Sequence, residues 1–104
     1  MNWEILTDKQ QFDSLMQNET LFAVFKHSTR CSISSMAKNR IEKEWNHQFP
    51  IYYLDLLQHR DVSNHIADVT NIEHQSPQLI VIKNGKPIYD ASHNFIYVND
   101  ITTE

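Results

Sequence analysis

Residues 21–34 read Leu-Phe-Ala-Val-Phe-Lys-His-Ser-Thr-Arg-Cys-Ser-Ile-Ser, and this stretch decides the fold. Residues 21–25 form a short continuous apolar run, which is typical of a strand buried on both faces. The polar residues 27–30 predict a loop. From Cys31 onward, apolar residues recur at intervals of three and four, which predicts a helix of about four turns that ends before Pro50. The residues expected on its buried face are Ile33, Met36, Ala37, Ile41 and Trp45.

The segments on either side alternate between strand-like and helix-like patterns. Four further strands are predicted from their apolar, aromatic and β-branched content, at residues 3–6, 51–56, 79–82 and 87–91. Asn84-Gly85, between the last two strands, is a strong signal for a hairpin. Pro87 suits the start of a strand or a strand at the edge of a sheet, because it cannot donate a ladder hydrogen bond.

Two further helices are predicted. Thr7 is expected to cap the first, with Gln10 three residues later completing a capping box. The second spans residues 61–70, and the tail at residues 93–104 has room for a short closing helix. The residues expected to face the core are Phe12, Leu15 and Met16 in the first helix and Val62, Ile66 and Val69 in the second.

This order predicts a three-layer α/β fold, in which a mixed sheet of four or five strands lies between three or four helices. Strands joined by helices are expected to run parallel, and the final hairpin adds two antiparallel strands. The length of 104 residues predicts a single domain over residues 1–104. A hydrophobic content of 40% is enough for a packed core.

Composition argues against several classes of function. A net charge of −4 with scattered lysines and arginines argues against a nucleic-acid surface. No apolar run approaches the roughly 20 residues that span a bilayer, and no secretory signal is visible, so a cytoplasmic protein is expected. A single glycine, Gly85, argues against phosphate-binding loops. The six histidines are dispersed and are expected mostly on the surface or in loops, so neither a metal site nor a tightly bound cofactor is expected.

Cys31 is the only cysteine, so no internal disulfide is possible, and it falls where the predicted loop meets the predicted helix. Unpaired N–H groups and the helix dipole at such a position stabilise a negative charge, which favours a reactive thiolate. Arg30 adds a positive charge nearby, and His27 is a candidate for a second. The alternative is a small buried core cysteine. The polar neighbours favour the reactive thiol, because the apolar face of the helix begins only at Ile33.

Ser34 stands three residues after Cys31, where a dithiol oxidoreductase has its second cysteine. Without that thiol, the chemistry of Cys31 must stop at a mixed disulfide that an external thiol resolves. Ser34 is expected either to donate a hydrogen bond to the thiolate or to lie on the helix surface. Ser76-Pro77 also has two interpretations: Pro77 starts the following strand, or it is a cis proline whose turn exposes the preceding backbone groups to an extended ligand.

Two segments carry a resemblance to a known family. Residues 26–34 resemble the active-site segment of the monothiol, YtxJ-like bacilliredoxins of Firmicutes, and residues 74–85 resemble their proline loop and hairpin. The order of strands and helices is similar to the thioredoxin fold over most of the chain. One residue departs from the family pattern: Ser32 follows the cysteine where the family has proline, a position that influences helix-start geometry and thiol potential.

The resemblance implies a thioredoxin-like three-layer sandwich and a redox role linked to bacillithiol, the low-molecular-weight thiol that serves these bacteria in place of glutathione. Cys31 would attack the mixed disulfide on a bacillithiolated protein and take bacillithiol onto itself. Free bacillithiol or a reductase would then regenerate the thiol. Bacillithiol is therefore the expected co-substrate, and bacillithiolated proteins are the expected partners. By the same resemblance Pro77 would be cis and lie beside Cys31. The candidate thiol-binding residues are Thr29, Arg30, Ser32, Ser34, Ser76 and Pro77.

Two other functions stay open on the sequence alone. The first is a non-catalytic binding module of the same fold, in which the groove at Pro77 holds a partner while Cys31 stays idle. The second is iron–sulfur carriage, in which Cys31 and a small thiol would share a cluster across a dimer. The second function is disfavoured because the chain has no other cysteine and no flexible glycine follows Cys31.

Overall fold

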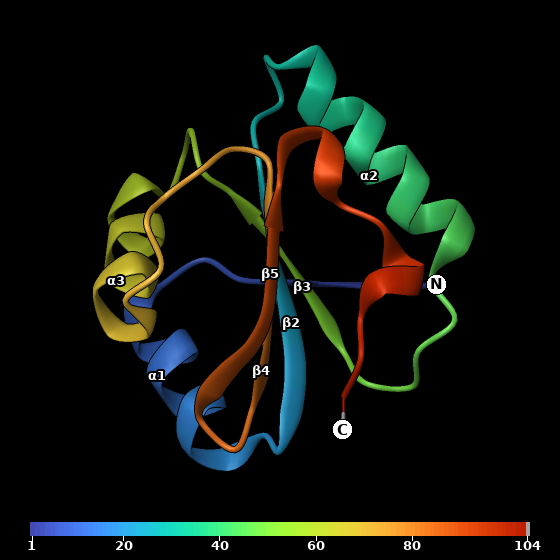
Figure 1. The fold of residues 1–104 in the computed structure, drawn as a ribbon. Helices are drawn as coiled ribbons and strands as arrows, with labels where there is room; N and C mark the ends of the chain where they lie inside the picture. Colours follow the sequence, from blue (N-terminus) through green and yellow to red (C-terminus); the bar gives the residue numbers. More distant parts are fainter. Residues whose placement is uncertain (104) are drawn as a thin grey trace.

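The computed structural model describes residues 1–103, and at its centre lies a five-stranded mixed sheet (Figure 1). The elements are β1 (Trp3–Ile5), α1 (Lys9–Asn18), β2 (Leu21–His27), α2 (Ser32–Glu44), β3 (Ile51–Asp55), α3 (Arg60–Thr70), β4 (Gln78–Lys83) and β5 (Lys86–Ser92). The strand order is β1-β3-β2-β4-β5. The first three are parallel, whereas β4 is antiparallel to β2 and β5 is antiparallel to β4. The predicted α/β class, with its antiparallel final hairpin, is confirmed.

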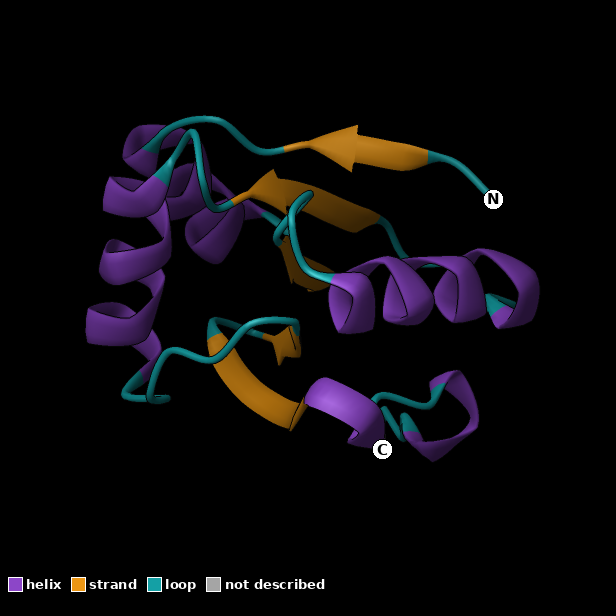
Figure 2. Cartoon of the chain, turned by 90° about the horizontal axis from the view of Figure 1, so that it is seen from above, coloured by secondary structure: helices purple, strands orange, loops and turns teal. Residues whose placement is uncertain are grey.

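The helices cover both faces of the sheet, as the views in Figures 1 and 2 show together. Alternate residues of the central strand β2 point to opposite faces, so that Phe22 and Val24 join one core and Ala23 and Phe25 join the other. The first core also contains residues of α1 and α3, and the second contains residues of α2 and of the C-terminal segment. Residues 21–25 are therefore buried on both faces, as predicted, except that Leu21 is only half-buried.

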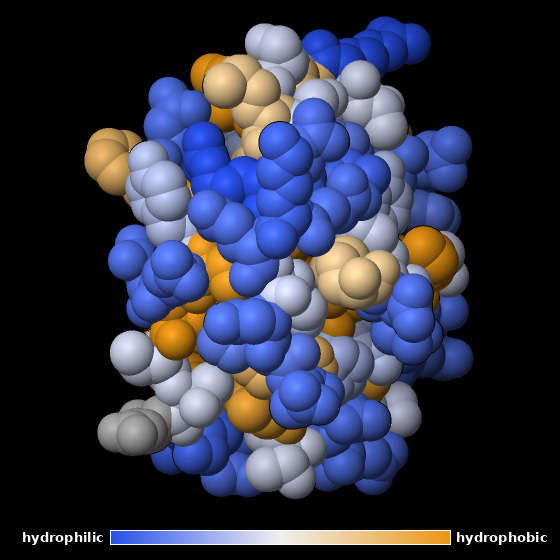
Figure 3. Space-filling model, turned by 90° about the vertical axis from the view of Figure 1, so that its right-hand side faces the viewer, coloured by the Kyte–Doolittle hydropathy of each residue, from blue (hydrophilic) through white to orange (hydrophobic). Residues whose placement is uncertain are grey.

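The buried face of α2 agrees with the prediction at Ala37 and Ile41, which are buried, and Trp45 packs against the same core. It differs at the start of the helix, where Ser34 is buried and Ile33 and Met36 are 38% and 57% exposed. The prediction for Ile33 and Met36 was wrong because it placed only apolar side chains on the inner face, whereas Ser34 has hydrogen-bond partners there. Figure 3 views the molecule from the α2 side and shows hydrophobic side chains scattered among hydrophilic ones.

The other helices and the tail also differ in detail from the predictions. Asp8, rather than Thr7, caps α1: its Oδ1 accepts a hydrogen bond from the Gln11 N–H at 2.7 Å, and Gln11 Oε1 accepts one from the Thr7 N–H at 3.0 Å. The predicted capping box of Thr7 and Gln10 was therefore wrong: Asp8 is the cap, and the Gln11 side chain accepts from the residue before the cap. In α3, Val69 is exposed, because the buried face continues instead through Thr70. The tail forms two short 3-10 turns, His93–Phe95 and Val98–Asp100, and Glu104 lies outside the described residues.

The hairpin between β4 and β5 depends on two positive φ angles. Asn84 has φ 53° and Gly85 has φ 74°, and this pair is typical of the two-residue turn that the sequence predicts. A Cβ atom at Gly85 would lie 3.3 Å from the backbone oxygen of Met16, which is closer than side-chain carbons normally approach.

Gly85→Ala is therefore expected to lower the free energy of unfolding by about 1–2 kcal/mol, because alanine is strained at this φ and meets a backbone atom. Urea unfolding measures the change, and Lys86→Ala in the same hairpin is the matched control. Equal midpoints for Gly85→Ala and the wild-type chain would contradict the strain argument.

Candidate active site

Cys31 is the N-cap residue of α2, so the predicted place of the thiol at a helix start is confirmed. Its backbone carbonyl accepts a hydrogen bond from the Ser35 N–H at 3.1 Å, and its own N–H donates to the Ser28 carbonyl at 3.2 Å. The side chain is half-exposed and makes no capping hydrogen bond. The backbone of Cys31 is thus fixed while its sulfur stays available at the positive end of the helix.

Ser34, in the first turn of α2, makes hydrogen bonds to the end of β2 and to the residue that follows it. Its hydroxyl is buried and accepts a hydrogen bond from the Ser28 N–H at 3.0 Å, and it lies 2.6 Å from His27 Nδ1. Both expectations for Ser34, a surface position and a hydrogen bond to the thiolate, were wrong. Ser34 stands where a dithiol oxidoreductase has its resolving cysteine, and it instead connects the first turn of α2 to residues 27 and 28, which precede Cys31.

His27 contributes a neutral ring rather than a second positive charge. It is 4% exposed and packs against the rings of Phe25 and Tyr53, at centroid distances of 5.6 and 5.4 Å. Burial, reinforced by the charge of Lys38, lowers the pKa of His27, although Asp55 and Glu42 oppose the shift. The imidazole is therefore predominantly uncharged at pH 7, so His27 does not add a second positive charge, and it lies at the end of β2 rather than in the predicted loop. Arg30 remains as the positive side chain next to Cys31 in the chain.

The Ser76–Pro77 peptide bond is cis, as the resemblance implied. Gln78 pairs with Lys26 at the last position of the β2–β4 register, so this bond lies directly beyond the pairing, next to the strand that leads to Cys31. The Pro77 carbonyl accepts a hydrogen bond from the His93 N–H at 3.0 Å. Within residues 1–103, the Ser76 N–H and C=O have no backbone partner, and the buried Ser76 hydroxyl has no partner at all. The turn therefore offers free polar groups beside the site.

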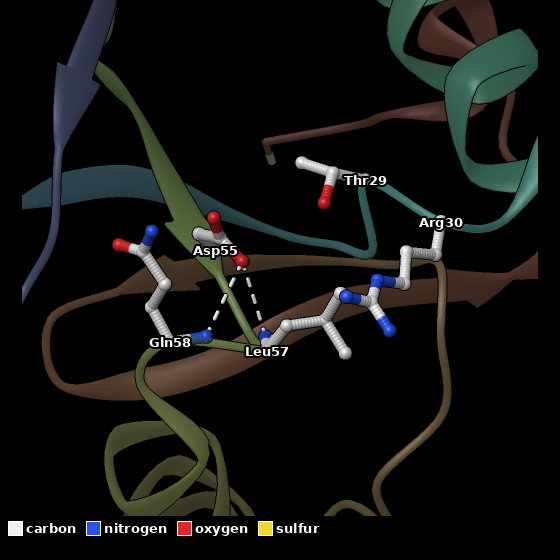
Figure 4. A pocket seen from close by; sticks show the side chains of 5 residues that line it. All are labelled: Thr29, Arg30, Asp55, Leu57 and Gln58. Atoms are coloured by element: carbon white, nitrogen blue, oxygen red, sulfur yellow. Dashed lines mark hydrogen bonds between the residues drawn. The ribbon is translucent and has the colours of Figure 1, made fainter.

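A pocket of about 380 Å³ opens next to the loop before Cys31 (Figure 4). Thr29 and Arg30 line it from that loop, and Asp55, Leu57 and Gln58 line it from the end of β3 and the segment that follows. The structure thus brings together two of the predicted thiol-binding residues. Ser32, by contrast, is exposed in the first turn of α2 and does not line the pocket.

A buried polar cluster lies behind the proline turn. Lys26 is fully buried, and its Nζ donates a hydrogen bond to the Ser63 carbonyl at 3.1 Å and lies 3.4 Å from His74 Nδ1. The Ser63 hydroxyl lies 2.8 Å from the same nitrogen. Burial lowers the pKa of Lys26 to about 8, and burial followed by the charges of Lys26 and Arg60 lowers the pKa of His74. The cluster ties β2 and α3 to the segment that leads to Pro77.

Sequence patterns did not identify the residues on the far side of the pocket, Asp55, Leu57 and Gln58, or the partners of Lys26, which are Ser63 and His74. One signal in the sequence pointed to Asp55: it lies near the carboxyl end of a predicted strand, where parallel strands present ligand-binding groups. Across residues 1–103, no group of three or more histidine, cysteine, aspartate or glutamate side chains is arranged to hold a metal ion. In the same part of the chain, no helix is long and apolar enough to cross a membrane.

Comparison with known proteins decides the family. The family model described as monothiol bacilliredoxin BrxC matches residues 4–101. The chain belongs to the monothiol bacilliredoxin family. A bacilliredoxin of this kind is a thioredoxin-fold thiol–disulfide oxidoreductase, and the single cysteine agrees with the monothiol type.

Solved structures agree with this bacilliredoxin assignment. A structure described as an oxidoreductase with a thioredoxin fold is 33% identical, with a TM-score of 0.84, over 92% of this chain and 87% of that one. Thioredoxin from Malassezia sympodialis is 14% identical, with a TM-score of 0.72, over 88% of this chain and 79% of that one. Oxidised thioredoxin from Plasmodium falciparum is 19% identical, with a TM-score of 0.69, over 88% and 86%. The two thioredoxins support the fold alone.

Proposed function

We propose that this bacilliredoxin removes bacillithiol from S-bacillithiolated proteins through a mixed disulfide on Cys31. The observation that carries the proposal is the position of the only cysteine, at the start of α2 with its side chain free of any capping hydrogen bond. Such a position stabilises the thiolate, which is the nucleophile in disulfide exchange. The cytoplasm, where thiols are kept reduced, is the proposed compartment.

The reaction takes two balanced exchanges. In the first, the Cys31 thiolate attacks the bacillithiol sulfur of the protein–bacillithiol disulfide, so that this S–S bond breaks, the protein thiolate leaves and a Cys31–bacillithiol disulfide forms. In the second, a free bacillithiol thiolate attacks the bacillithiol sulfur of that disulfide. Cys31 leaves as thiolate and bacillithiol disulfide is released. The substrate protein is reduced, and bacillithiol is oxidised.

Ser34 provides no second thiol, so the first exchange has no internal resolving step. The groups proposed to hold the substrate are the free backbone groups of Ser76 at the Ser76–Pro77 turn, the Thr29 and Arg30 side chains, and Ser32 at the helix start. The Ser76 N–H and C=O suit an extended peptide segment next to the disulfide, because an extended strand presents the same groups. In this proposal the chain of the substrate protein lies along the turn and the small thiol lies on the other side of Cys31.

The test is intact-mass spectrometry of the reduced protein mixed with a bacillithiolated test protein, with Cys31→Ala as the paired variant. We expect the bacillithiol mass to move from the test protein to the wild-type chain and to stay on the test protein with Cys31→Ala. Arg60→Ala, a charge change outside the proposed site, is the matched control and is expected to retain transfer. If the wild-type chain gains no adduct, the proposed removal of bacillithiol through Cys31 fails, and the binding module becomes the function to pursue.

A further inference from the structure

We propose that the pocket between residues 29–30 and residues 55–58 binds the part of the low-molecular-weight thiol that lies away from its sulfur. The ligand class is a thiol that carries a carboxylate, for Arg30, and an ammonium or hydroxyl group, for Asp55. The inference rests on the proposed function, because it concerns the small-thiol half of the same disulfide exchange.

The two sides of the pocket carry opposite charges, Arg30 on one side and Asp55 on the other, and these two side chains do not form an ion pair. The exposed Arg30 guanidinium makes no hydrogen bond or ion pair with any of residues 1–103, including Asp55 across the pocket. Figure 4 shows Thr29 and Arg30 on one side of the pocket and Asp55 and Gln58 on the other. A ligand with groups of both signs would pair with both walls, and a guanidinium binds a carboxylate through two parallel N–H donors.

The Asp55 wall is held in place before any ligand binds. One carboxylate oxygen, Oδ1, accepts hydrogen bonds from the Leu57 N–H at 3.1 Å and the Gln58 N–H at 3.4 Å (Figure 4). The Asp55 carbonyl accepts a third, from the His59 N–H at 3.0 Å, and the His27 carbonyl accepts one from the Leu56 N–H at 3.0 Å. The second carboxylate oxygen keeps its acceptor capacity. A wall fixed in this way loses little conformational entropy on binding.

The location links the pocket to the reacting sulfur. β2 and β3 are parallel neighbours, so their carboxyl ends lie at one edge of the sheet, where α/β folds place their ligands. Arg30 directly precedes Cys31, so a ligand that reaches Arg30 lies beside the residue that forms the disulfide. The volume of about 380 Å³ lies in the range of small-molecule sites. The partly exposed Leu57 side chain adds an apolar surface for the carbon skeleton of the ligand.

The test compares two small disulfides as substrates for the reduced protein. Bacillithiol disulfide carries carboxylate and amino groups, whereas hydroxyethyl disulfide carries neither. With both, the Cys31 thiolate attacks one sulfur, the S–S bond breaks, one thiolate leaves and a mixed disulfide forms on Cys31. Intact-mass spectrometry gives both rate constants, and the ratio of the rate constant for bacillithiol disulfide to that for hydroxyethyl disulfide measures recognition of the charged groups. We expect Arg30→Gln and Leu57→Trp each to lower this ratio about tenfold, the first by removing a charge-assisted contact and the second by filling the pocket.

Ile88→Trp on β5 is the matched control, because it adds the same ring at a similarly exposed position outside the pocket. It is expected to leave both rate constants unchanged. If Arg30→Gln lowers the ratio and Leu57→Trp does not, long-range attraction explains the preference and the pocket inference is overturned. An unchanged ratio in both variants also overturns it, while adducts on Cys31 would still support the proposed function. If neither disulfide reacts with Cys31, the proposed function and this inference fail together.

Discussion

Ser34→Cys is expected to change the end product of the reaction from a bacillithiol adduct to an internal disulfide between Cys31 and the new thiol at position 34. Residues three apart at a helix start have Cβ atoms roughly 5–6 Å apart, which is close enough for a disulfide after a small adjustment. The new thiolate would attack the Cys31 sulfur of the mixed disulfide and release bacillithiol as a free thiol. Intact-mass spectrometry distinguishes the products, because the adduct adds the mass of bacillithiol and the internal disulfide removes two hydrogen atoms.

Ser34→Ala is the control for this change. Both variants lose the hydrogen bonds of Ser34 with His27 and Ser28, so each is expected to lower the free energy of unfolding by about 1–3 kcal/mol. Only the cysteine variant gains a second thiol. Ser34→Ala should therefore still accumulate the adduct on Cys31. If Ser34→Cys accumulates as much adduct as the wild-type chain, the thiol at position 34 does not reach the Cys31 sulfur, and the predicted internal exchange does not occur.

Lys26→Met is expected to remove a rise in stability with pH that the wild-type chain shows between about pH 8 and pH 10. Folding lowers the pKa of Lys26 from 10.5 to about 8, so in this interval the unfolded chain binds a proton that the folded chain does not. The free energy of unfolding therefore increases with pH, by up to about 3 kcal/mol for a shift of this size. Below pH 8, both states bind the proton and the charged lysine destabilises the fold.

Urea unfolding of both proteins at several pH values measures this effect as the difference between them. Burial raises the pKa values of Tyr52, Tyr53 and Tyr89 in both chains. The contribution of these tyrosines to the pH dependence of stability therefore cancels in the difference. Lys86→Met, at an exposed position, is the matched control and is expected to keep the rise. A rise of the same size in Lys26→Met would show that Lys26 keeps its ordinary titration in the folded chain.

The order of elements could be predicted from the sequence because it depends on local patterns. The apolar run at residues 21–25, the Asn84-Gly85 turn and the helix start at Cys31 each have a local cause, and the structure has all three. The buried face of α2 could not be predicted in the same way. It depends on a hydrogen bond between Ser34 and His27, and periodicity of apolar residues says nothing about a buried serine.

In the candidate site, too, some residues could be predicted from local sequence and others could not. Cys31, Thr29 and Arg30 lie in one contiguous segment, so a motif finds them. The opposite wall of the pocket depends on which strands are neighbours: β3 lies beside β2, and only this order brings Asp55 and Gln58 next to Arg30. The Lys26 cluster likewise joins three elements that are far apart in the sequence. Local patterns do not specify such pairings, because tertiary packing decides them.

The two outer strands of the sheet differ from the inner ones in a way that affects contact between copies of the chain. β1 has only three residues, and β5 carries Pro87 close to the irregularity in its register with β4 at Val81 and Ile82. A short edge, a proline and a bulge are features that keep a sheet from extending into another molecule and aggregating. At high concentration, strand addition at these margins is therefore disfavoured.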